Sequence, residues 1–169
     1  MIPGLLQTSN YIRAVFTGTS TFPEERIQRH VDARVERQEI LDRLYPPEYV
    51  AIIDESALRR RAGNHEVMRE QIMHLTNMAL RPRVTIHVLP FTAGLHAATL
   101  GAFQIMDFSE PKDPTIAYAE IPTSTVYVEG DEEIACYEAM WREVHNAALT
   151  SAQTIDFLHD MSTSLEGES

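Results

Sequence analysis

The spacing of hydrophobic positions changes along the chain, from a helical period to a strand period and back to a helical one. Up to residue 45 it predicts two helices, one over 9–16 and one over 21–44 that stops before Pro46 and Pro47. The second helix is expected to bury a stripe made of Ile27, Val31, Val35, Leu41 and Leu44. Its other face carries charges of both signs. We expect a solvated face there or, as an alternative, pairing with the same helix of a second copy.

The middle of the chain predicts a strand, a helix and a second strand. Residues 49–53 are continuously apolar, a helix over 66–80 with a cap at Asn64 follows, and residues 84–89 form the next strand. The short joints indicate a βαβ crossover, so these two strands should be parallel. Strands over 102–108, 115–120 and 125–129 then predict an antiparallel meander added to the same sheet. Two further helices are expected from residue 131 and from Thr150 or Ser151.

The predicted fold class is therefore α/β (α+β), with a mixed five-stranded sheet that combines a βαβ unit and an antiparallel meander. Helices pack on this sheet, and a helical pair precedes it. We expect residues 1–45 to be an N-terminal helical segment that forms one compact unit with an α/β domain over 46–161. The polar residues 162–169 are expected to be a flexible tail.

Charge is distributed unevenly, and this bears on the partners of the chain. Residues 91–169 carry only Lys112 and Arg142 against fourteen carboxylates. Such a segment repels phosphate backbones, so no direct contact with nucleic acid is expected. No apolar run approaches the roughly 20 residues of a membrane helix, and the N-terminus does not resemble a signal peptide. We therefore expect a cytoplasmic protein without membrane contact. The single cysteine, Cys136, is expected to be a small core residue.

Several familiar chemistries lack their motifs in this chain. There is no glycine-rich phosphate loop, no GxSxG elbow and no CxxC pair. His65-Glu66 is followed by Arg69 where a zinc-protease helix would place its second histidine, so neither a metal nor another cofactor is expected. A recognition helix of the helix-turn-helix type is also missing.

Candidate ligand-binding residues follow the two parallel strands, because ligands in α/β sheets bind beyond the carboxyl ends of the strands. These candidates are Asp54, Glu55, Arg59, His87, Phe91 and His96. Asp54 is equally well explained as a helix cap, which leaves Glu55 as the better functional candidate. The arginine and both histidines also have ordinary interpretations as solvated, sheet or loop residues. Tyr118, Glu120 and Tyr127 join the candidates if the register places them on one face of the meander.

Several ordered blocks carry a family resemblance that extends from Pro3 to about Ile155. The blocks are residues 3–8 with Tyr11, Arg34, and residues 37–41, 53–60, 67–71, 84–91 and 94–96. Together they resemble the domain of unknown function that follows an Xre-type helix-turn-helix in many actinobacterial transcription regulators. The resemblance implies a region that senses a ligand or dimerises. In that family a DNA-binding domain precedes the first block, whereas Met1 stands two residues before Pro3 here.

Three functions stay open at this point. The first is a ligand-sensing and dimerising effector domain without its DNA-binding part, with an unidentified small molecule and a second copy as partners. The alternative is a stand-alone, cofactor-independent enzyme of the cyclase or isomerase type in natural-product biosynthesis. Glu55 and His96 would then be its catalytic acid and base. A purely structural partner domain is the third.

Overall fold

A computed structural model describes residues 1–19, 22–110, 112–121 and 124–166 of the chain. The chain forms two compact units, the first made of Met1–Phe91 with Leu149–Ser169 and the second of Thr92–Ala148. The second unit is thus an insertion into the first, and the chain crosses between them twice.

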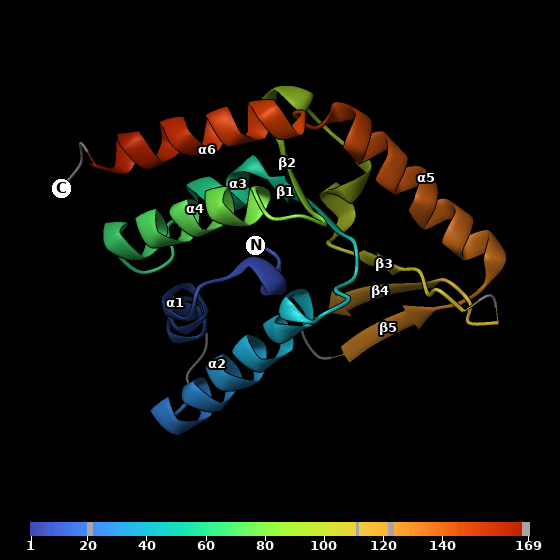
Figure 1. The fold of residues 1–169 in the computed structure, drawn as a ribbon, viewed down its shortest axis with the longest axis horizontal. Coiled ribbons are helices and arrows are strands. Elements are labelled where there is room, and N and C mark those ends of the chain that lie inside the picture. The colour runs from blue at the N-terminus through green and yellow to red at the C-terminus, as the bar shows by residue number, and fades with distance from the viewer. Residues whose placement is uncertain (20–21, 111, 122–123, 167–169) are drawn as a thin grey trace. The chain divides into compact units, whose positions relative to one another are not determined.

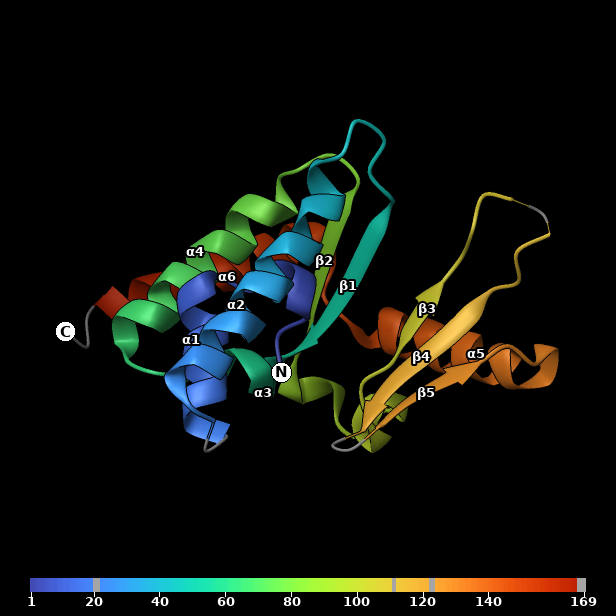
Figure 2. The same ribbon diagram turned by 90° about the horizontal axis from the view of Figure 1, so that it is seen from below.

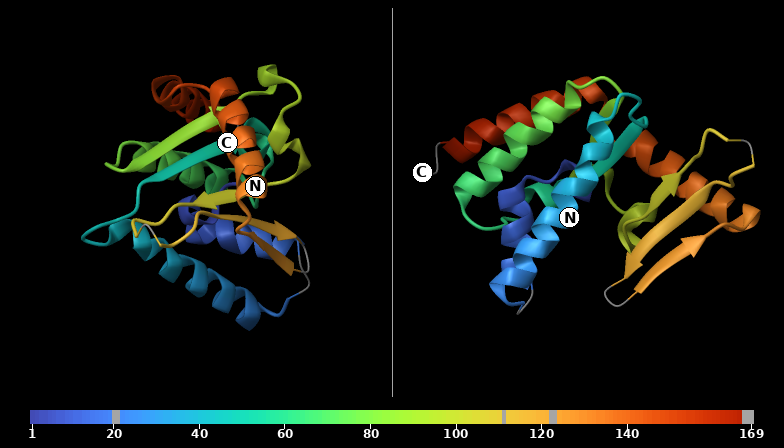
Figure 3. Two further views of the ribbon diagram at one scale, coloured as in Figure 1. Left: turned by 90° about the vertical axis from the view of Figure 1, so that its right-hand side faces the viewer. Right: turned by 60° about the horizontal axis from the view of Figure 1, so that its bottom comes forward.

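The first unit is mainly helical around a two-stranded parallel sheet (Figure 1). Strand β1 (Tyr49–Asp54) pairs with β2 (Val84–Leu89), from Tyr49 opposite Val84 to Asp54 opposite Leu89, and the two lie side by side in Figure 3. The helices of this unit are η1 (Gly4–Leu6), α1 (Ser9–Thr19), α2 (Glu24–Gln38), η2 (Glu39–Asp42), α3 (Glu55–Arg59), α4 (His65–Ala79) and α6 (Ser151–Glu166).

The core of the first unit lies between this small sheet and its helices. Helices α4 and α6 run side by side and both contact β2 (Figures 1 and 3). The largest fully buried apolar side chains come from η1, both strands, α4 and α6, and include Leu6, Ile53, Ile72, Leu75, Ile86 and Leu158. A smaller cluster of Ile12, Ile27 and Val31 joins α1 to α2. The apolar faces that the sequence predicted for α4 and both strands therefore meet in one core.

The second unit contains a three-stranded antiparallel sheet and one long helix (Figure 2). Strands β3 (Gln104–Met106), β4 (Ile116–Ile121) and β5 (Ser124–Val128) lie in sequence order. Helix α5 (Asp131–Ala147) contacts β4, and Ala117 of that strand is fully buried. Two short 3-10 helices, η3 (Phe91–Ala93) and η4 (Ala97–Leu100), precede the strands.

The mixed α and β class, the parallel βαβ unit and the antiparallel meander are confirmed, but the single five-stranded sheet is wrong. Within the described residues the strands form two separate sheets. The reason lies at Val88, because the start of the C-terminal helical segment occupies the outer edge of β2. Leu149 N donates to Val88 O (2.8 Å), and Val88 N donates to Thr154 Oγ1 (3.0 Å). No ladder positions are left at Val88 for a further strand.

Three smaller predictions also differ from the structure. The long second helix ends as α2 at Gln38 and continues as the tighter turn η2, so the stripe is lost beyond Val31 except at Leu41. Val35 is 37% exposed and Leu44 is 86% exposed. Cys136 is exposed on α5, not part of a core. The segment from Ser162, expected to be a flexible tail, is helical as far as Glu166.

None of the helices in the described ranges has both the length and the hydrophobicity that crossing a bilayer requires.

Candidate functional site

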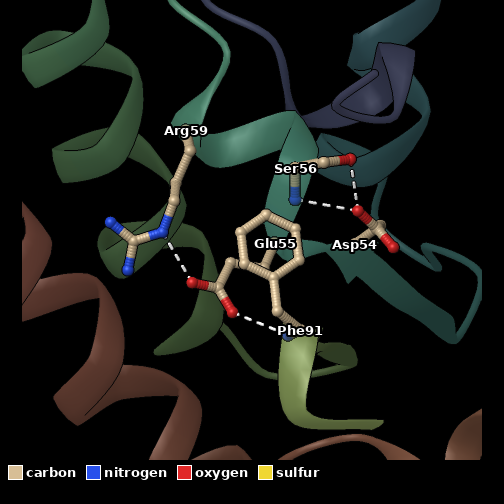
Figure 4. Close-up of polar contacts among 5 residues, drawn as sticks. All are labelled: Asp54, Glu55, Ser56, Arg59 and Phe91. Carbon is tan, nitrogen blue, oxygen red and sulfur yellow. Dashed lines mark hydrogen bonds and ion pairs between the residues drawn. The ribbon is translucent and has the colours of Figure 1, made fainter. Parts of the chain in front are cut away.

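The two parallel strands end at the same edge of their sheet, where several of the predicted residues meet (Figure 4). Strand β1 passes directly into α3, and the chain leaving β2 reaches Phe91 two residues after the strand ends. Asp54 accepts a hydrogen bond from Ser56 N (2.8 Å) and is the N-cap of α3. The capping interpretation of Asp54 is thus confirmed, which leaves Glu55 as the remaining carboxylate at this edge.

Glu55 uses both of its carboxylate oxygens within the protein (Figure 4). Oε1 accepts from Arg59 Nε (2.6 Å), and Oε2 accepts from the backbone N–H of Phe91 (2.8 Å). The residue is only 6% exposed, whereas the side chain of its partner Arg59 is about half exposed. Because both oxygens are engaged by donors of the chain, Glu55 fastens the segment after β2 to the end of β1.

His87 is buried in β2 and holds the second crossing of the chain. Its Nδ1 lies 2.8 Å from the backbone oxygen of Leu149. Since a carbonyl oxygen can only accept, Nδ1 is the protonated nitrogen in this contact. Leu149 is therefore held by two hydrogen bonds: its N–H donates to the carbonyl of Val88, and its carbonyl accepts from Nδ1 of His87. The side chains of Glu55 and His87 thus bind the main chain within the first unit. Glu55 does so where the chain leaves this unit, and His87 does so where the chain returns to it.

The register of β4 with β5 brings together the two candidate tyrosines of the meander. Tyr118 lies opposite Tyr127, and their ring centroids are 5.2 Å apart. The Tyr118 hydroxyl donates to Glu120 Oε1 (2.5 Å), and this hydrogen bond, with a smaller effect of burial, raises the pKa of Tyr118. Tyr127 and Glu120 are exposed. A solvated pair with one carboxylate is ordinary sheet pairing and does not by itself form an enclosed site.

His96 is the N-cap residue of η4, in the second unit. The candidates therefore divide between the units. Asp54, Glu55, Arg59, His87 and Phe91 belong to the first unit, and His96, Tyr118, Glu120 and Tyr127 belong to the second. The structure brings Asp54, Glu55, Arg59 and Phe91 together, but it does not gather all the candidates in either unit.

A hollow that the sequence did not predict lies between α1 and α2. It measures about 530 Å³ and is open to solvent. Its wall is lined by Ser9, Asn10, Arg13, Gln28, Val31, Asp32, Val35, Glu36 and Glu39. Arg13 donates to Glu24 and Gln28, and Gln28 donates to Asp32 Oδ1 (2.7 Å). The charged face of the second helix, for which the sequence left a solvated face or pairing with a second copy open, thus borders a concave polar surface.

Buried amides form a second feature that sequence reasoning missed. Gln71 is fully buried and bridges η1 to α4, because its Nε2 donates to Leu6 O (2.7 Å) and its Oε1 accepts from Thr8 N (2.7 Å). Gln7 is also buried and donates to Ile2 O (2.6 Å), while Arg34 donates to its side-chain oxygen (2.7 Å). Gln38 also donates to Gly4 O and Gln7 O (both 2.8 Å), so Arg34 and the blocks at 3–8, 37–41 and 67–71 are joined by hydrogen bonds. The sequence signal that could have indicated this network is the presence of polar residues within otherwise apolar patterns.

Metal binding receives no support from the side chains that the structure places. Among the residues it describes, no group of three or more His, Cys, Asp or Glu side chains is arranged to hold an ion.

The fold and these contacts define a class of α+β domain in which a helical unit on a two-stranded parallel sheet receives a β-meander as an insertion. A family described as "Domain of unknown function (DUF5753)" matches residues 1–160, and the chain belongs to this family. No curated protein and no solved structure gives a significant match.

Proposed function

We propose that this chain is the ligand-sensing and dimerising effector domain of an actinobacterial transcription regulator of the Xre helix-turn-helix type. The observation that carries the proposal is the hollow between α1 and α2. Its volume of about 530 Å³ is large enough for a small molecule, and its wall combines polar groups of both charge signs with the buried Val31 and the exposed Val35. A concave surface of this kind suits recognition of a small polar molecule.

The chemistry of the hollow favours a ligand that carries an amine. Asp32, Glu36 and Glu39 supply three carboxylates along one side of α2 and η2. Arg13 is the one basic residue of the lining, and it is already paired with Glu24. A cationic group is therefore attracted more strongly than an anion.

The contacts of Glu55 support binding over catalysis. A general base must reach the proton that it removes, and Glu55 is buried with both oxygens hydrogen-bonded to Arg59 and Phe91. His96, the other candidate of the alternative enzyme, stands at the N-cap position of η4 in the second unit, whereas Glu55 belongs to the first. The cyclase or isomerase interpretation therefore finds no support in the arrangement of these two residues.

A thermal-shift screen of polar metabolites, divided into amine-bearing and purely anionic sets, tests the proposal. An amine-bearing ligand should raise Tm saturably, with about 2.7 kcal/mol of added stability at 100 times Kd, and should be recovered unchanged. Glu36→Gln should weaken the shift, whereas Glu25→Gln should leave it intact because Glu25 lies on the same helix outside the hollow. If no member of either set shifts Tm, or if the two variants respond equally, the ligand site is not this hollow.

The dimer is tested separately by sedimentation velocity on the same protein. A sensing module that pairs through α2 should sediment with twice the 19.2 kDa mass of one chain. Ala33→Arg places a charge on an exposed position of α2 outside the hollow and should return the protein to the single-chain mass. A single-chain mass at all accessible concentrations would exclude the dimerising part of the proposal and leave the binding part standing.

A further inference from the structure

Strand β5 presents an open edge. It pairs with β4 on one side, and within the described residues no strand pairs with its other side. The pairing with β4 is continuous over five residue pairs, from Ala117 opposite Val128 to Ile121 opposite Ser124, so no bulge interrupts it. The sequence Ser124–Val128 contains no charge, proline or glycine. Natural edge strands usually carry one of these features because an unprotected edge pairs with other chains.

The side chains of β5 are also available to a partner. Residues 124–127 are exposed, and Tyr127 reaches 62%. Tyr127 and Val126 are both exposed and lie on opposite faces of this edge strand. They therefore offer contact area to both faces of an added strand. Hydrogen bonds of the β5 main chain would supply the affinity for the added strand, and the side chains of Val126 and Tyr127 would supply the selectivity, as in other cases of strand addition.

The charge around β5 determines what kind of strand it accepts. The second unit holds ten carboxylates and two basic side chains, a net charge of −8. Glu120 lies opposite Thr125 of β5, and Glu129 follows the strand directly. A second copy of this unit would bring the same negative charge to the edge and be repelled, whereas a basic segment is attracted.

A hollow of about 310 Å³ at the end of β5 is large enough to hold one side chain of such a segment. It is lined by Pro114, Thr115, Glu129, Asp131, Ile134, Ala135 and Glu138. Lysine and arginine combine an apolar stem with a cationic head, and this wall combines apolar residues with three carboxylates. One of these carboxylates has a basic neighbour, since Arg142 Nη1 lies 3.5 Å from Glu138 Oε2.

We infer that β5 is a docking edge for an extended basic segment of a partner protein. The segment adds a strand to the β3-β4-β5 sheet through main-chain hydrogen bonds and places a lysine or arginine among Glu129, Asp131 and Glu138. The inference does not rest on the proposed ligand site between α1 and α2, because all the residues that carry it belong to the second unit.

Fluorescence anisotropy with labelled synthetic peptides tests the inference on the full chain. The probe is a heptapeptide of alternating arginine and valine, compared with a glutamate-valine counterpart and with the same arginine-valine peptide N-methylated at alternate amides. The basic peptide should bind and weaken with added salt, and the acidic one should not bind. N-methylation keeps the charge but removes strand hydrogen bonds, so it should weaken binding about tenfold or more. Equal binding of both basic peptides would overturn strand addition.

Location and charge are tested by NMR and by a matched pair of triple variants. Amide signals of Ser124–Val128 should shift and exchange more slowly with solvent when the basic peptide is bound. Glu129→Gln, Asp131→Asn and Glu138→Gln together should weaken binding about tenfold, because three charges around one cation are removed. Glu25→Gln, Glu48→Gln and Asp156→Asn make the same chemical change at exposed positions of the first unit and should change affinity less than twofold. Perturbations confined to other residues, or equal effects of the two triple variants, would overturn the assignment of β5.

Discussion

Thr154 is the residue whose replacement tests the account of the fold most directly. It is fully buried in the first turn of α6, and its Oγ1 accepts the hydrogen bond of Val88 N at 3.0 Å. Thr154→Val keeps the shape of the side chain and exchanges the hydroxyl for a methyl group. The N–H of Val88 then loses its partner at the edge of β2, where no strand replaces it.

The size of the effect follows from two opposing contributions. An unpaired buried donor costs about 1–3 kcal/mol, while the extra buried methyl group returns about 0.8 kcal/mol. We therefore expect Thr154→Val to lower the free energy of unfolding by about 0.2–2.2 kcal/mol. Thr163→Val is the control in the same helix, because Thr163 is exposed and its hydroxyl donates to His159 O of the preceding turn (3.1 Å). That change should stay within about 0.5 kcal/mol.

Urea denaturation followed by circular dichroism measures both variants, and amide exchange reports on Val88 itself. The Val88 amide should exchange faster in Thr154→Val and at the original rate in Thr163→Val. Equal stabilities of the two variants, together with an unchanged Val88 amide, would refute the view that the start of α6 closes the edge of β2.

Three further changes have equally definite expectations. Gln71→Met leaves Leu6 O and Thr8 N unpaired and should cost about 2–4 kcal/mol in urea denaturation, against less than about 0.5 kcal/mol for exposed Gln28→Met. Burial raises the pKa of Tyr49 from 10.0 to about 12, with a small opposing effect of Arg37. The stabilisation by protonated Tyr49 is therefore complete below pH 10 and is lost as the pH rises to about 12. The fall in the free energy of unfolding between pH 10 and about 12 should become smaller in Tyr49→Phe but not in Tyr45→Phe. Glu120→Gln should lower the pKa of Tyr118 towards 10, as followed by tyrosine carbon chemical shifts, and Glu129→Gln should not; an unchanged Tyr118 titration would contradict the hydrogen bond to Glu120.

Local elements could be predicted from the sequence because their causes are local. The continuous apolar run at 49–53 identified a buried strand, and Asn64 begins α4 as a cap whose side chain accepts from Val67 N (3.0 Å). Alternation allowed Tyr118 and Tyr127 to share a face, and the register of β4 with β5 places them opposite each other. Each of these depends on residues that are close in sequence.

What the sequence did not predict depends on contacts between distant residues. Glu55 reaches Phe91 across 36 positions, and Val88 reaches Thr154 across 66. The period of the hydrophobic positions indicates which face of a strand is buried, but not which segment pairs with its edge. The division of the strands into two sheets could therefore not be predicted from it. For the same reason the pattern suggested Glu55 as a functional carboxylate but could not indicate that both its oxygens are engaged.

The insertion of the second unit has a consequence for how this protein can be dissected. Its two junctions lie close together in space, because Leu149 is hydrogen-bonded to Val88 only three residues before Phe91. A short glycine-serine bridge can therefore join the flanks of the excised meander without stretching the helical body. Evolution has the same freedom, so relatives with shortened, enlarged or exchanged segments at this position are compatible with an unaltered scaffold.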